Sequence, residues 1–134
     1  MRYTFTAIFS AAIVLTGAAA YGAEPETRLL VRDLHRAERL IAAAVSAADQ
    51  QELRQQRRAL LGASSRIPRT EETVTSVNCG MAVSSLANLA LDLSEVHQAR
   101  KVISAEAEQR AYIGYVTECE RKLDIKPPAR PNLR

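Results

Sequence analysis

Two cysteines, Cys79 and Cys119, constrain the fold of this chain more than any other feature. Each lies on an apolar stripe whose members recur at steps of three and four residues, the spacing of one face of an α-helix. The first stripe comprises Cys79, Ala82, Leu86, Leu89, Leu93 and Val96, and the second comprises Ala105, Tyr112, Val116, Cys119 and Leu123. The second stripe is offset by two residues from the continuation of the first, which corresponds to about 200° around a single helix. This change of phase predicts two helices.

The distance between the cysteines predicts how these helices are arranged. In one straight helix the two residues would lie about 60 Å apart at 1.5 Å per residue, whereas a disulfide requires Cα atoms within about 7 Å. We therefore predict an antiparallel hairpin that reverses between His97 and Ser104, with Ser104 as the cap of the returning helix. The alternative is one long helix that forms an intermolecular disulfide, and the absence of Gly and Pro between positions 95 and 113 favours it.

The N-terminal sequence indicates an oxidising environment for this pair. Arg2 precedes an uncharged run that extends to Ala23. This pattern predicts a secretory signal peptide at residues 1–20, with cleavage after Ala20 or, as the second choice, after Gly22. The alternative interpretation is an uncleaved membrane anchor. The run is rich in Ala, Thr, Ser and Gly, which makes it less hydrophobic than such an anchor. We expect a periplasmic or secreted protein, in which a lone pair of cysteines is normally oxidised.

The rest of the chain is also helical in pattern. Another apolar stripe predicts a first helix and comprises Leu30, Leu34, Ala37, Ile41, Ala44 and Ala48. Asp49, followed by Glu52 three residues later, is typical of a capping box and predicts a break near Asp49 with a new helical piece after it. The predicted fold is all-α. Residues 24–124 form a small antiparallel bundle of three to four helices, stapled by one disulfide.

Residues 125–134 are predicted to form a flexible tail. Three prolines, at positions 127, 128 and 131, favour an extended conformation and oppose a helix. Basic residues accompany them, and chain termini of this kind are commonly mobile.

The sequence lacks the usual signatures of catalysis and cofactor binding. It contains no C-x-x-C or C-x-x-C-H motif, no metal-ligand spacing, no phosphate-binding glycine loop and no nucleophile elbow. We therefore expect no enzyme activity, cofactor or metal, and a permanent structural disulfide. His35 is expected to be solvated or to cap a helix. Glu118 and Glu120 are expected to face water, because residues two apart diverge on a helix.

Arginines supply the candidate interaction face. The residues proposed for it are Arg28, Arg32, Arg36, Arg54, Arg57, Arg58 and Tyr115. The first three recur at four-residue steps and so repel one another along one ridge, which an acidic partner would relieve. A net charge of +3, 4% aromatic residues and no Trp argue against nucleic acid as the partner.

These observations predict a non-enzymatic exported protein. It would bind another polypeptide through a helix face, as an interaction or accessory protein of the chaperone, inhibitor or envelope-assembly type. The alternative function is a peripheral module that binds anionic lipid or polysaccharide through its arginines. The sequence leaves the oligomeric state open.

Overall fold

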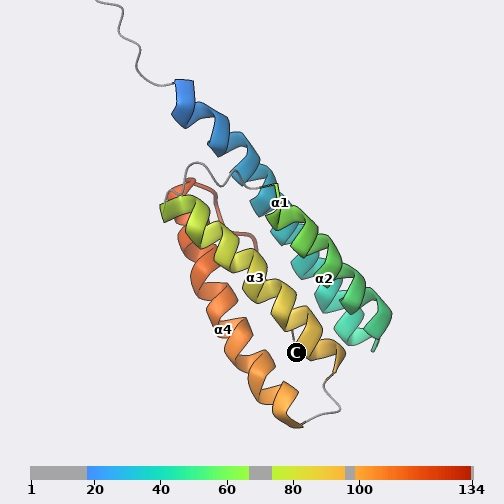
Figure 1. The fold of residues 1–134 in the computed structure, drawn as a ribbon. Helices are drawn as coiled ribbons and strands as arrows, with labels where there is room; N and C mark the ends of the chain where they lie inside the picture. Colours follow the sequence, from blue (N-terminus) through green and yellow to red (C-terminus); the bar gives the residue numbers. More distant parts are fainter. Residues whose placement is uncertain (1–17, 67–73, 96–98, 134) are drawn as a thin grey trace, which may run out of the picture.

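The structure, a computed structural model, describes residues 18–66, 74–95 and 99–133 of the chain. These residues form four helices and no strand, which confirms the predicted all-α bundle (Figure 1). The helices are α1 (Ala18–Ser46), α2 (Gln50–Ser64), α3 (Val74–Ser94) and α4 (Ala99–Lys122). None of these four described helices combines the length and apolar character needed to cross a lipid bilayer. The predicted signal peptide lies almost entirely outside the described residues.

The chain reverses between α1 and α2 at the predicted break. The Asp49 carboxylate accepts a hydrogen bond from the backbone N–H of Glu52 at 2.9 Å and thereby caps α2. Ala48 has a φ of 53°, in the left-handed region that turns the chain out of α1. The reciprocal half of a capping box is not used, because the backbone N–H of Asp49 donates to the carbonyl of Ala44 at 2.8 Å.

The hairpin of α3 and α4 is joined by the predicted disulfide. Cys79 and Cys119 of the same chain are bonded, with 5.0 Å between their Cα atoms. The reversal comes earlier than predicted, because α3 ends at Ser94 and α4 begins at Ala99. Ser104 therefore lies inside α4 and does not cap it. Its hydroxyl instead donates a hydrogen bond across the hairpin to the buried carboxylate of Asp92. Because the reversal is shorter, both residues fall within helices that face each other.

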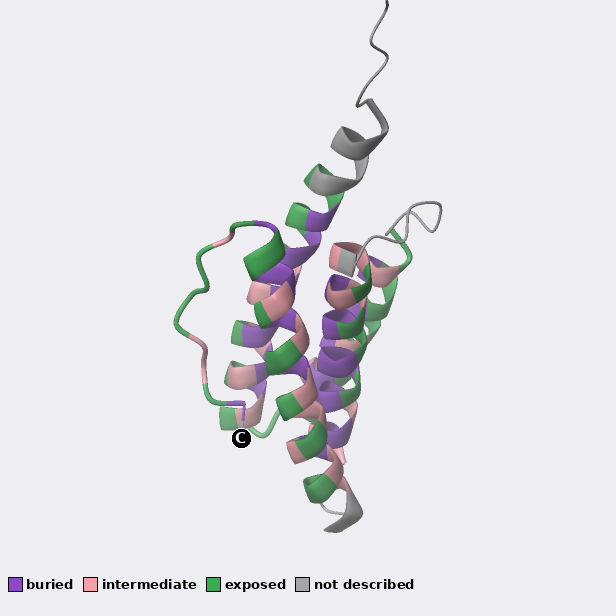
Figure 2. Cartoon of the chain, turned by 90° about the vertical axis from the view of Figure 1, so that its left-hand side faces the viewer, coloured by how far each residue is buried: buried purple, intermediate pink, exposed green. Residues whose placement is uncertain are grey.

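The predicted apolar stripes form the core. Most of their described members are buried, and the buried positions of the helices face one another across the bundle (Figure 2). Leu34, Ile41, Leu86, Tyr112 and Val116 have no exposed side-chain surface. The ends of two stripes depart from the pattern, because Ala48 is exposed at the α1–α2 turn and Leu93 is only partly buried.

The C-terminal segment, residues 124–133, returns along the bundle after α4 (Figures 1 and 2). The sequence predicts a flexible tail from residue 125; in the structure Arg130 of this segment makes two ion pairs and Leu133 is only 2% exposed. The physical reason is that α1 and α4 make little direct contact with each other. The segment bridges these two helices and covers apolar and charged side chains that would otherwise be open to water.

Candidate functional site

Two buried carboxylates from different helices share one guanidinium. Glu38 of α1 is 2% exposed and Glu120 of α4 is 1% exposed. Arg130 of the C-terminal segment donates from Nη1 to Glu38 Oε1 and from Nη2 to Glu120 Oε2, each at 2.7 Å. We call these three residues the clasp. It ties α1, α4 and the C-terminal segment together at one point.

His35 extends the clasp at the edge of α1. Its Nε2 lies 2.7 Å from Glu120 Oε1, and its side chain is 16% exposed. A carboxylate oxygen accepts hydrogen bonds, so this contact is a hydrogen bond in the tautomer that protonates Nε2. The prediction that His35 is solvated or a helix cap is therefore wrong, as is the prediction that Glu120 faces water. Glu120 lies on the flank of α4 that faces α1 and the C-terminal segment.

Tyr112 lies beneath the clasp. The Arg130 guanidinium is 6.0 Å from the centre of its ring, within the range of a cation–π contact. The Tyr112 hydroxyl is buried beside Glu38 but has no hydrogen bond of normal geometry to any described residue. Burial, reinforced by the negative charge of Glu38, raises the pKa of Tyr112 well above its ordinary value. The hydroxyl is therefore neutral at physiological pH.

Arg130 remains a cation in the same environment. Burial opposes the charged form of Arg130, but the attraction of Glu38 and Glu120 outweighs this effect and raises its pKa. The ionic groups of the clasp thus pair with one another, an arrangement that holds chain segments together. Within the described ranges, no three His, Cys, Asp or Glu side chains are grouped so as to hold a metal ion.

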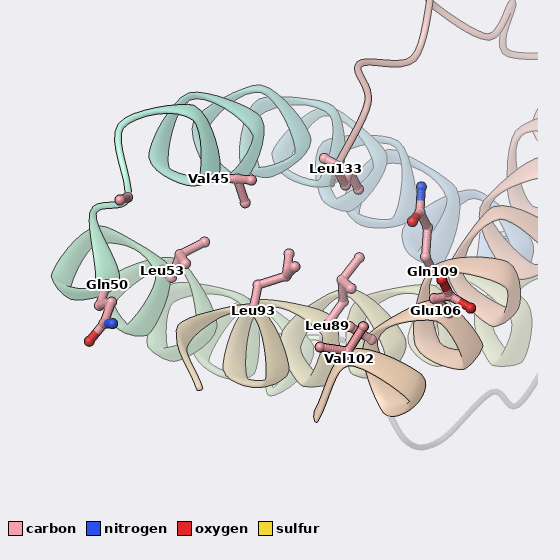
Figure 3. Close-up of a pocket in the computed structure, with 11 residues that line it drawn as sticks. Val45, Gln50, Leu53, Leu89, Leu93, Val102, Glu106, Gln109 and Leu133 are labelled. Atoms are coloured by element: carbon pink, nitrogen blue, oxygen red, sulfur yellow. The ribbon is translucent and has the colours of Figure 1, made fainter. Parts of the chain in front are cut away.

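An apolar pocket lies three residues further along the C-terminal segment. Leu133 enters it opposite Leu89 and Leu93 of α3, while Val45 and Leu53 approach from α1 and α2 (Figure 3). With Leu133 in place, a cavity of about 350 Å³ remains. The residues that line the pocket are Val45, Ala48, Gln50, Leu53, Leu89, Leu93, Val102, Ala105, Glu106, Gln109 and Leu133. This volume and this mainly apolar lining are typical of sites that bind a ligand or an anchoring side chain.

The arginines predicted as an interaction face are distributed over two helices. Those on α1 are exposed and form the predicted ridge, comprising Arg28, Arg32 and Arg36. On α2, Arg54 and Arg58 are exposed, whereas Arg57 is half-buried. The Nε atom of Arg57 is buried without a hydrogen-bond partner among the described residues.

Other contacts limit which of the predicted residues are available on this face. Asp33 of α1 pairs at 3.2 Å with Arg66, which lies just after the end of α2, and Arg36 lines a shallow hollow beside that pair. Tyr115, predicted to mark a contact surface, is partly buried and packs against the core from α4. The structure thus presents the α1 ridge to solvent and uses much of Tyr115 in internal packing.

The sequence predictions missed the clasp, although its carboxylates left a signal. Glu38 follows Leu34 by four residues and precedes Ile41 by three, and Glu120 stands in the same relation to Val116 and Leu123. An acidic residue at a position of an apolar stripe indicates a buried charge that needs a partner. That partner, Arg130, comes from a segment without helical periodicity. No local pattern connects it to either carboxylate.

Comparisons with known protein families, curated proteins and solved structures found no match for this chain. The clasp and the apolar pocket are therefore the features from which a function is inferred.

Proposed function

We propose that this chain is an exported, non-enzymatic interaction or accessory protein that binds another polypeptide by taking one of its apolar side chains into the pocket. The observation that carries this proposal is the cavity of about 350 Å³ that remains beside Leu133. Its lining includes Val102, which is 47% exposed and so lies where a partner can reach it. Burial of one large apolar side chain contributes about 1.5–3 kcal/mol, enough for an anchoring contact.

Two other observations support this proposal. The intrachain disulfide is compatible with an oxidising compartment and with the predicted export. The ionic groups of the clasp are paired among α1, α4 and the C-terminal segment, which supports a structural role for them and a non-enzymatic protein.

Val102 and Ile103 provide a matched test. They are neighbours on α4 and both are exposed, at 47% and 74%, but only Val102 lines the pocket. A photo-crosslinking amino acid is placed at each position of the full chain expressed in its native host. We expect a covalent adduct with a defined polypeptide from position 102 and none from position 103. Ala105→Leu, which adds volume inside the pocket, should reduce the adduct at position 102. Equal adducts at both positions, or none at either, contradict the proposal.

The exposed ridge of Arg28, Arg32 and Arg36 favours a second function, binding to an anionic lipid or polysaccharide surface. Vesicles containing phosphatidylglycerol, sedimented with the oxidised protein at low salt, test it. Binding should weaken steeply with salt and be lost in the double variant Arg32→Glu with Arg36→Glu, whereas Val102→Glu should leave it unchanged. Absence of binding at low salt excludes this function.

A further inference from the structure

The C-terminal segment contacts the bundle in the way that a bound peptide contacts a receptor. It contains neither helix nor strand between residues 125 and 133, and its prolines favour an extended backbone. Two side chains anchor it to different kinds of surface. Arg130 meets buried carboxylates, and Leu133 enters the apolar pocket. A charged anchor and an apolar anchor three residues apart, about 9 Å in an extended chain, make a two-point recognition element.

The receptor side of this contact belongs to the helices. Glu38 and Glu120 supply a buried, doubly negative acceptor for one guanidinium, a geometry that Arg satisfies and Lys does not. Leu89, Leu93 and Ala105 supply much of the apolar surface. None of these five residues lies in the C-terminal segment. The same surface would remain on the helices if another extended chain replaced that segment.

Leu133 does not fill its pocket. The cavity of about 350 Å³ that remains can take a larger side chain, and an unfilled apolar cavity lacks packing contacts that such a side chain would supply. A competing peptide with a bulkier apolar anchor therefore has more to gain there than the chain's own leucine.

We propose that the clasp carboxylates and the apolar pocket form a binding site for an extended segment of a partner polypeptide. That segment has the pattern Arg-x-x-apolar, with an aromatic residue preferred as the apolar anchor. The chain's own C-terminal segment occupies this site as an intramolecular competitor. This inference rests on the proposed function and names the chemistry of its partner. The partner displaces Arg130 and Leu133 together, because both anchors lie on one short extended segment. Tethering gives the chain's own segment an effective concentration in the millimolar range, so a free peptide must outcompete it.

A peptide with the sequence of residues 125–134, labelled with a fluorophore, tests the site. The receptor is the oxidised full chain carrying Arg130→Ala with Leu133→Ala, which disables its own segment and leaves the sequence of the four helices unchanged. We expect saturable binding, and about threefold tighter binding of the peptide with Leu133→Phe. Peptides with Arg130→Ala or Leu133→Asp should bind at least about tenfold more weakly, since each removes one anchor.

The unmodified full chain should also bind the peptide about tenfold more weakly, because its site is occupied. A folded receptor that fails to discriminate between the arginine and alanine peptides overturns the inference.

A second measurement decides the question if the double variant does not fold. The unmodified full chain, isotopically labelled, is titrated with the Leu133→Phe peptide to millimolar concentration and followed by NMR. The amide signals of Asn132 and Leu133 should move to the positions of a released segment, while those around Cys79 and Cys119 stay in place. No displacement overturns the inference, as does a dimer formed by exchange of C-terminal segments between two copies, which makes a second copy the occupant.

Failure of this inference can be distinguished from failure of the proposed function. Crosslinking from position 102 to a polypeptide without an Arg-x-x-apolar segment leaves the proposed function standing and overturns this inference. Peptide binding without any crosslink from position 102 supports the site's chemistry and contradicts the proposed polypeptide partner in the host.

Discussion

Arg130 and Glu38 stand 92 positions apart in the sequence, and their side chains are joined by a hydrogen bond of 2.7 Å. The second nitrogen of the same guanidinium reaches Glu120 at the same distance. One side chain near the end of the chain therefore connects the first helix with the last. Because α1 and α4 make little direct contact, much of the closure of the bundle on this side depends on the clasp.

Removal of the Arg130 guanidinium should be strongly destabilising. Arg130→Ala leaves two carboxylates buried without their cation, and the loss of one partner of a buried ion pair typically costs about 3–5 kcal/mol. Urea denaturation followed by circular dichroism measures the change in free energy of unfolding. Arg121→Ala is the matched control, because the Arg121–Glu118 pair is exposed, and it should cost less than about 1 kcal/mol. Equally small losses for both variants would show that the clasp is not formed in solution.

The disulfide should supply a large share of the stability. Cys79 and Cys119 are separated by 40 positions, and a cross-link over a loop of that length stabilises by about 4 kcal/mol in the chain-entropy model. The double variant Cys79→Ala with Cys119→Ala should therefore unfold at markedly lower denaturant concentration. A non-reducing gel provides an independent check, since the wild-type chain should migrate as a monomer. A disulfide-linked dimer at stoichiometric yield would contradict the intrachain bond.

The cap of α2 should contribute less to the stability of the protein than the disulfide does. Asp49→Ala removes the acceptor for the backbone N–H of Glu52 and should cost about 1 kcal/mol. Asp49→Asn keeps an acceptor oxygen at the same place and should retain most of that stability. Thermal unfolding of the two variants under identical conditions tests the difference. Equal melting temperatures would show that the carboxylate does not act as a cap.

Stability should fall as the pH rises above about 10. In the unfolded chain Tyr112 ionises near its ordinary pKa of 10.0, but in the folded chain its pKa is raised, so the unfolded state loses its proton first and is favoured as the pH increases. Lys101 acts in the same direction. Hydrogen bonds to Asp92 and Glu95 raise its pKa above the ordinary 10.5, so its contribution is complete below that pH and is lost as the pH rises through the folded-state value.

Tyr112→Phe isolates the tyrosine contribution to this effect. Melting temperatures measured from pH 7 to pH 11 should decline less steeply in this variant than in the wild type. At pH 7 the variant should be at least as stable, because the hydroxyl it removes is buried without a hydrogen bond of normal geometry to any described residue. Identical pH profiles for the two proteins would rule out a neutral, buried Tyr112 in the folded chain.

Local patterns predicted the helical elements well, and for a definite reason. Helical spacing of Leu34, Ile41 and Leu86 indicates which side of each helix is buried, because a helix must place its apolar side chains away from water. The break at Asp49 was predictable because capping depends on residues only three positions apart. The position of the α3–α4 reversal was not, because nothing between positions 95 and 113 breaks a helix.

The helices, their buried sides and the hairpin favoured by Cys79 and Cys119 could be predicted from the chain alone, since periodicity, capping and the reach of a disulfide are local or geometric constraints. The structure then showed that this disulfide lies within one chain. The folded bundle was needed to show that Arg130 joins Glu38 to Glu120 and that Leu133 enters the pocket. Those contacts depend on the limited direct contact between α1 and α4. Such an arrangement arises from the packing of whole helices, and the sequence of a short extended segment carries no periodic signal of the surface on which it will lie.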